Sequence, residues 1–119
     1  MKEIAFVFSH APHGTSLGRE GLDAIFSISS IINKISVFFI NDGVFQIQKN
    51  IGSENILSRD YTAAFPILSL YDIKDLYCCK LSLIQRGLSL QHNFILNVNI
   101  LDVDLLRLKL DSYDAIINF

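Results

Sequence analysis

The sequence predicts an α/β fold in a single domain over 1–119, with three layers and a mostly parallel sheet of about five strands. Continuous apolar runs occur at 4–8 and 35–40, and such runs are typical of strands that are buried on both faces, as in parallel sheets. The segment between them has apolar residues at helical intervals. This part of the chain therefore has the length of one right-handed crossover unit.

The first helix is expected over 16–33, after a loop at 9–14, and Thr15 or Ser16 can cap it. Its apolar side chains form two stripes. The first stripe contains Leu22, Ile25, Phe26 and Ile32, and the second contains Ala24, Ile28, Ile31 and Ile35. Together they are wider than one face of a sheet needs, which indicates a contact with another chain.

Shorter elements are expected in the rest of the chain. In order, these are a helical turn at 44–51, a loop at 52–55, a helix at 56–70, a strand at 76–79, a helix at 80–86, a strand at 94–100, a helix at 103–110 and a strand at 115–119. Pro66 should kink or divide the helix that contains it, and Gly87 should end the next one. Asp102 is a good N-cap, which favours a helix at 103–110 although LLRLKLD also alternates like a strand.

The composition limits the possible partners. Hydrophobic residues make up 50% of the chain and charged residues only 18%, which predicts a face buried against another chain. A net charge of −2 gives no basis for direct nucleic-acid binding. The apolar run at 4–8 is too short for a signal peptide, and no run is long enough to span a bilayer. We therefore expect a cytoplasmic protein with no membrane or nucleic-acid partner.

A candidate site is expected at the carboxyl ends of the strands, where parallel sheets place their functional edge. The loop at 10–15, the turn at 41–43 and the segment after Cys79 should meet there. The loop lacks both phosphate-binding glycine patterns, so it either lines a site or is a turn with exposed histidines. His10 and His13 have no third ligand at a suitable spacing. We expect no metal and no cofactor.

The two cysteines are adjacent, so their side chains should point to opposite faces of the sheet. They do not form a CxxC redox pair. At a helix N-terminus the thiolate form of Cys79 would be favoured, and His10 or His13 could accept its proton. Burial in apolar surroundings would instead raise the pKa of the thiol and keep it inert. The simpler interpretation is that both are small buried hydrophobes. The absence of a GxSxG elbow argues against a serine hydrolase.

Several segments resemble one known family. They are IAFVFSHAPHGTSLGREGLDAIF, VFFINDGVFQ, LSRDYTAAF, LYDI, RGL at 86–88 and the final SYDAIINF. The chain is similar over 1–119 to the DsrF/TusC branch of the DsrE-like sulfur-relay proteins, and SxAPHGTxxGREGLDA is the most specific part. Pro66 departs from the pattern expected in this family.

The resemblance implies a cytoplasmic subunit of a TusBCD-type complex, a dimer of heterotrimers with TusB-type and TusD-type partners. Such a complex passes persulfide sulfur from a TusA-type donor to a TusE-type acceptor, for 2-thiolation of the wobble uridine (mnm5s2U) of tRNA. In this family the sulfur-carrying cysteine belongs to the D-type subunit. It lies eight residues before the glycine of an Arg-Gly pair, and counting back from Gly87 gives Cys79.

The resemblance therefore implies a positioning subunit that is not itself an enzyme. Its candidate sulfur-handling edge contains Cys79, His10 and His13. The alternative is a sulfurtransferase in its own right that carries persulfide on Cys79. A third hypothesis is an unrelated small-molecule or nucleotide-binding domain that uses the loop SHAPHGT, which the missing glycine-rich phosphate motif disfavours.

Overall fold

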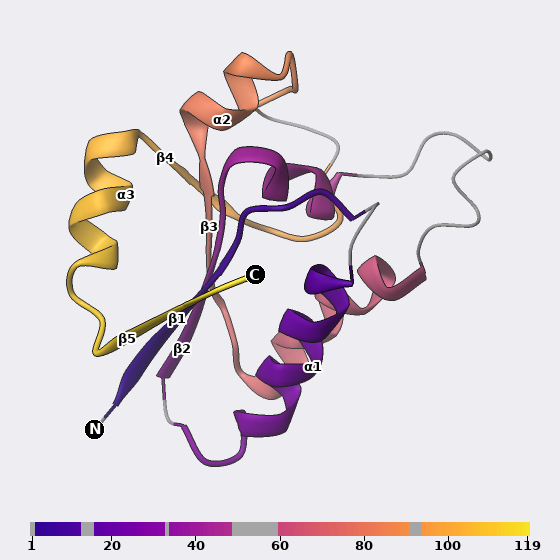
Figure 1. Ribbon diagram of the computed structural model, residues 1–119, viewed down its shortest axis with the longest axis vertical. Coiled ribbons are helices and arrows are strands. Elements are labelled where there is room, and N and C mark those ends of the chain that lie inside the picture. The colour runs from indigo at the N-terminus through magenta and orange to yellow at the C-terminus, as the bar shows by residue number, and fades with distance from the viewer. Residues whose placement is uncertain (1, 13–15, 33, 49–59, 91–93) are drawn as a thin grey trace.

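A computed structural model describes residues 2–12, 16–32, 34–48, 60–90 and 94–119. Five parallel strands form one sheet in the order β4-β3-β2-β1-β5 (Figure 1). The strands are β1 (Glu3–Phe8), β2 (Lys34–Phe39), β3 (Asp75–Cys79), β4 (Asn99–Leu101) and β5 (Ala115–Asn118). The α-helices are α1 (Leu17–Ile28), α2 (Lys80–Gln85) and α3 (Val103–Leu110), and the 3-10 helices are η1 (Asn41–Ile47) and η3 (Asp60–Tyr71).

Helices cover both faces of the sheet, with α1 and η3 on one face and α3 on the other (Figure 1). The α1 face contains a cluster of buried aromatic side chains, namely Phe6, Phe8, Phe39 and Phe65. The α3 face has a smaller cluster, formed by Ala5, Val7, Phe38, Tyr77, Cys79 and Leu106. Successive residues of β1 and β2 thus enter opposite clusters, which explains their unbroken apolar runs. The predicted three-layer α/β class is confirmed.

Four of the five predicted strands lie within one residue of the observed bounds. The helix predicted at 103–110 has the observed bounds, and Asp102 occupies its N-cap position. Its carboxylate makes no capping hydrogen bond and instead lies 3.9 Å from the Lys80 ammonium. Gly87, with φ +69°, follows α2 as predicted, because glycine adopts this left-handed conformation without strain.

The first helix is shorter than predicted, since α1 ends at Ile28. Its last turn is rich in serine: the Ser27 hydroxyl donates to the Asp23 carbonyl and the Ser29 hydroxyl to the Phe26 carbonyl. Serine side chains that bond to the backbone in this way compete with helix continuation. At the other end Ser16 is the N-cap residue, but its hydroxyl donates to the Glu20 carboxylate at 2.6 Å. Thr15 lies outside the described residues.

Most of the second stripe predicted for this helix packs within the chain itself. Ala24 and Ile28 are partly buried and pack against the core of the α1 face, and Ile35 is buried in β2. Ile31 follows the helix and is 74% exposed. One residue of the second stripe is thus open to solvent, and the rest help to build the core.

The middle of the chain and the fourth strand also differ from the prediction. The predicted turn at 44–51 is η1, which begins earlier, and the part of 56–70 that is described is the 3-10 helix η3, with Pro66 inside it. Residues 52–55 lie outside the described part. Strand β4 covers only Asn99–Leu101, which pair with the last three residues of β3. Earlier in the predicted segment, the Ile95 amide donates to the Ile47 carbonyl and does not join the sheet. Among the described residues, no helix is long and apolar enough to cross a membrane.

Candidate functional site

The carboxyl ends of β1, β2 and β3 meet at one edge, and η1 lies at its centre. The Ile40 amide donates to the Phe8 carbonyl at 3.0 Å, and the Gly43 amide donates to the Ile40 carbonyl at 2.8 Å. A Cβ atom on Gly43 would lie 1.8 Å from the Phe8 carbonyl oxygen. Because this neighbour is backbone and cannot move aside, the close approach of η1 to β1 requires glycine.

The backbone of His10 is attached to η1 through Gln46. This glutamine is 1% exposed, and its side-chain Nε2 donates to the His10 carbonyl at 2.9 Å. The His10 imidazole is exposed, with Nδ1 3.4 Å from the Ser9 hydroxyl. The main chain of the predicted loop is therefore placed by a buried amide, while its histidine ring faces solvent. His13, the second predicted histidine, lies outside the described residues.

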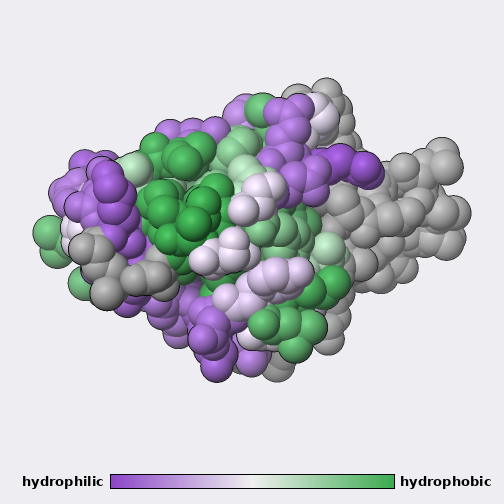
Figure 2. All heavy atoms as spheres, turned by 90° about the horizontal axis from the view of Figure 1, so that it is seen from below, coloured by the Kyte–Doolittle hydropathy of each residue, from purple (hydrophilic) through white to green (hydrophobic). Residues whose placement is uncertain are grey.

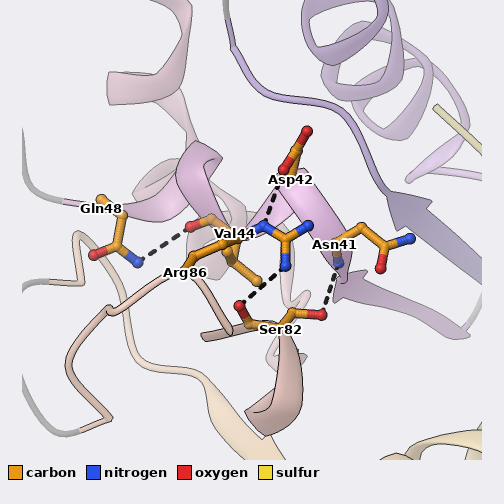
Figure 3. A network of polar contacts seen from close by, with 6 residues as sticks. All are labelled: Asn41, Asp42, Val44, Gln48, Ser82 and Arg86. Carbon is orange, nitrogen blue, oxygen red and sulfur yellow. Dashed lines mark hydrogen bonds and ion pairs between the residues drawn. The ribbon is translucent and has the colours of Figure 1, made fainter. Parts of the chain in front are cut away.

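On its other side η1 is joined to α2. The Asn41 amide donates to the Ser82 hydroxyl at 2.9 Å (Figure 3). The Arg86 Nε donates to the Asp42 carboxylate at 2.9 Å, and its Nη1 donates to the Ser82 carbonyl at 3.2 Å. We call these four residues (Asn41, Asp42, Ser82 and Arg86) the η1–α2 network. A further bond joins the end of η1 to the residue after it: the Gln48 side-chain Nε2 donates to the Val44 carbonyl at 3.1 Å.

Sequence reasoning missed this network, although two signals for it were available. The Asn-Asp-Gly turn at 41–43 and the Arg-Gly pair at 86–87 are both visible in the sequence as local features. Asp42 and Arg86 are 44 positions apart in the chain, so their contact could be found only by placing β2 next to β3. The prediction that these two segments and the start of the His10 loop share one edge is confirmed for the described residues.

The two thiols lie on opposite faces of the sheet, as predicted. Cys78 is 0% exposed within the α1-face core, where burial, with a smaller contribution from the neighbouring Cys79, raises its pKa to about 12. It is therefore protonated at neutral pH. Cys79 is 6% exposed and packs in the α3-face cluster with Val7 and Leu106. It is the last residue of β3 and the N-cap of α2.

Among the described residues, no group of three or more His, Cys, Asp and Glu side chains could hold a metal ion. A hollow of about 460 Å³ lies beside Phe65, Ile73 and Leu76, near the amino end of β3. Cys79 is at the other end of that strand. The edge thus consists of a buried thiol, an exposed imidazole and a polar network that connects the segments that bear them.

Known proteins of the same length match this chain. The family model described as "DsrE/DsrF-like family" matches residues 2–119. "Protein TusC" of Buchnera aphidicola subsp. Acyrthosiphon pisum (strain Tuc7) is 72% identical over 119 residues, which is the whole of both chains. "Protein TusC" of Shigella flexneri is 50% identical, again over the whole of both chains.

Among solved structures, the ychN protein from E. coli superposes with a TM-score of 0.80 over 100% of both chains, at 22% sequence identity. This likeness concerns the fold, and it agrees with the parallel sheet described above. The family match and the full-length relatives confirm the resemblance found in the sequence, and the chain belongs to the DsrE/DsrF-like family.

Proposed function

We propose that the chain is a structural and positioning subunit of a TusBCD-type sulfur-relay complex. In this proposal it assembles with TusB-type and TusD-type subunits, and the complex passes persulfide sulfur toward 2-thiolation of the wobble uridine of tRNA. The observation that carries the proposal is the 72% identity to a Protein TusC over the full length of both chains. The protein acts in the cytoplasm and does not contact the tRNA itself.

Exposed apolar side chains support an assembled state. Seen from below, apolar residues gather near the middle of the face, between polar regions (Figure 2). Large hydrophobic side chains with more than half of their surface exposed include Ile31, Leu70, Ile84, Leu105 and Leu108. A chain with so few charges gains stability when such residues are covered by other subunits.

The packing of Cys79 supports a role other than that of sulfur carrier. A carrier thiol must be reached by a donor and then by an acceptor, since persulfide transfer requires attack at an exposed sulfur. The Cys79 side chain is instead packed among Ala5, Val7 and Leu106. We infer that the carrier cysteine belongs to the D-type partner and that this chain positions that partner within the complex.

Substitution of Cys79 by serine tests the proposal. In a strain that lacks the native gene, Cys79→Ser is expected to restore at least about 80% of the 2-thiouridine content of tRNA, with the complex intact by size-exclusion chromatography. Serine is nearly isosteric with cysteine but places a hydroxyl in an apolar cluster, so the size-exclusion measurement also checks that the packing of β3 survives the change. The matched variant is the D-type cysteine changed to serine, which is expected to abolish thiolation.

The alternative function, a sulfurtransferase that carries persulfide on Cys79, gives the opposite result. Loss of thiouridine with Cys79→Ser in an intact complex would establish it. It has one local observation in its favour, because Cys79 both ends a strand and begins a helix at the carboxyl edge of the sheet.

A further inference from the structure

We propose that the open edge of β5 pairs with β5 of a second copy of this chain, antiparallel and across a two-fold axis that passes beside Ile117. The inference concerns the edge strand of this chain and does not depend on the proposed sulfur relay. β5 is the outermost strand next to β1, and all four of its residues are exposed. Within the described part of the chain, no segment pairs with its outer side. The main-chain groups on that side are therefore available to another strand.

The β5 edge lacks the features that usually keep such edges apart. Its sequence is Ala-Ile-Ile-Asn, with no lysine and no proline. It pairs with β1 residue for residue, without a bulge. The strand at the other edge, β4, has three residues, of which two are partly buried. Since exposed apolar edges without such protection bind further strands, β5 is the edge suited to an extended partner.

The direction of the main-chain groups decides which of them are available. Phe119, which follows β5, is bonded on both sides of its residue: its amide to β1 at 2.7 Å, and its carbonyl to the residue after β1 at 2.8 Å. Main-chain groups point alternately to the two sides of a strand, so those of Ile117 also point toward β1. The amides and carbonyls of Ile116 and Asn118 therefore point to the open side.

This pattern favours one antiparallel register, with a second β5 as the partner. When Ile117 lies opposite its own copy, Ile116 lies opposite Asn118 of the other copy. All the outward groups of both strands then find partners, because the strand offers the same pattern in reverse. The alternative register, with Ile116 opposite its own copy, sets Asn118 against Asp114. The Asp114 amide is already bonded to β1 at 2.9 Å.

The side chains of β5 agree with this register. Ile117 lies beside Phe6 on the α1 face, and Ile116 lies beside Ala5 on the α3 face. They are 38% and 44% exposed. The two copies of Ile117 would face each other with Cα atoms about 4.5 Å apart, so that each covers the other. Asp114 lies outside the paired residues, so no like charges meet.

Cysteine cross-linking of the full-length chain tests the register. Ile117→Cys is expected to form a disulfide-linked dimer on mild oxidation, because a disulfide spans the expected Cα separation. Ile116→Cys is the matched control on the same strand, since its two copies would be about 8 Å apart and too distant to link. The wild type controls for the native thiols, which are buried. Ile117→Cys should give at least about tenfold more linked dimer than either control.

A proline at the open edge gives a second test. Ile116→Pro removes an outward N–H and leaves the bonds to β1 in place, as prolines on edge strands do. In analytical ultracentrifugation at about 0.5 mM, the wild type should contain dimer and Ile116→Pro should be monomeric, since a contact this small is weak. Hydrogen exchange at the Asn118 amide should be at least about tenfold faster in the variant. The Ile117 amide, bonded to β1 in both proteins, should stay protected.

Three results would overturn the proposal. They are equal linking of Ile116→Cys and Ile117→Cys, a wild type that is monomeric at the highest concentration, and unchanged exchange at Asn118 in Ile116→Pro. Protection of Asn118 that appears only after B-type or D-type subunits are added would also overturn it, because another chain would then occupy the edge. If Ile117→Cys fails to fold, sedimentation and exchange decide the matter.

Discussion

The two faces of the sheet are built differently. The α1 face has an aromatic core in which Phe8 contacts Phe39, Phe65 and Phe119 at ring-centroid distances of 5.4 to 5.9 Å. The α3 face is covered by one helix of eight residues, whose only buried side chain is Leu106. At the edge of the sheet, all four residues of β5 are exposed. Most of the stability of the fold therefore comes from the α1 face.

The comparison also separates two uses of apolar residues. On the α1 face they fill the interior of this chain. On the α3 side, Leu105 and Leu108 of the helix and Ile116 of β5 are left in contact with solvent, and Leu108 lies between Arg107 and Lys109 in the sequence. A face of this kind is typical of subunits that complete their packing in an assembly.

The largest effect should come from truncating a side chain on each face. Phe8→Ala is expected to lower the free energy of unfolding by about 4 kcal/mol, because it removes a fully buried ring with three aromatic neighbours. Leu106→Ala should lower the free energy of unfolding by about 2 kcal/mol, since Leu106 belongs to the smaller buried cluster of the α3 face. Urea unfolding followed by circular dichroism gives both values. Equal costs would contradict the difference between the faces.

An intermediate effect, with a pH dependence, is expected for Cys78. Cys78→Ala should cost about 1 kcal/mol at pH 7 through lost packing. In the unfolded chain this thiol ionises near its ordinary pKa of 9.0, whereas burial keeps it protonated in the fold up to about 12. Between these values the folded state binds more protons, so the wild type loses stability as pH rises above 9.

The Cys78→Ala variant has no such group, and its disadvantage should shrink between pH 9 and pH 10. Urea midpoints measured at pH 7, 9 and 10 for both proteins would show this change. Parallel profiles over that range would mean that the thiol is not shielded as its burial indicates.

The smallest effect on folding, and the sharpest on assembly, is expected at Ile31. Ile31→Lys should change the free energy of unfolding by less than about 0.5 kcal/mol, because the side chain is already exposed. It is expected to reduce co-purification with the B-type and D-type partners. Leu108→Lys is the matched variant on the α3 face, where Leu108 is 67% exposed against 74% for Ile31. Weaker assembly in Leu108→Lys alone would place the subunit contact on the α3 face instead.

The sheet could be predicted from the sequence because its signals are local. Unbroken apolar runs, Gly87 and the position of Asp102 each depend on a few neighbouring residues. The prediction was wrong where local and tertiary preferences compete. FILNVNI has the composition of a strand, but β3 is short, so Phe94 forms an isolated bridge with Gln48 and only the last part of the segment joins the sheet.

The candidate site was predicted as a place and not as a set of contacts. The carboxyl edge follows from the parallel orientation of the strands, which the unbroken apolar runs indicate. The bonds from Gln46 to the His10 carbonyl and from Arg86 to Asp42 depend on side chains brought together by the fold over 36 and 44 positions. The opposite orientation of the two cysteines was predictable, since it requires only the two-residue period of a strand.

The pairing of β1 with β5 has a consequence for how the chain folds during synthesis. Ile4 of β1 pairs with Ala115 of β5, so one edge of β1 stays unpaired until a segment more than a hundred residues later in the chain has been made. Until then, the nascent chain presents an apolar strand with an unpaired edge, a structure prone to aggregation. Pairing over such a sequence distance also slows folding, because a large loop must close first. The β1 edge is thus open to pairing with other chains until β5 has been made.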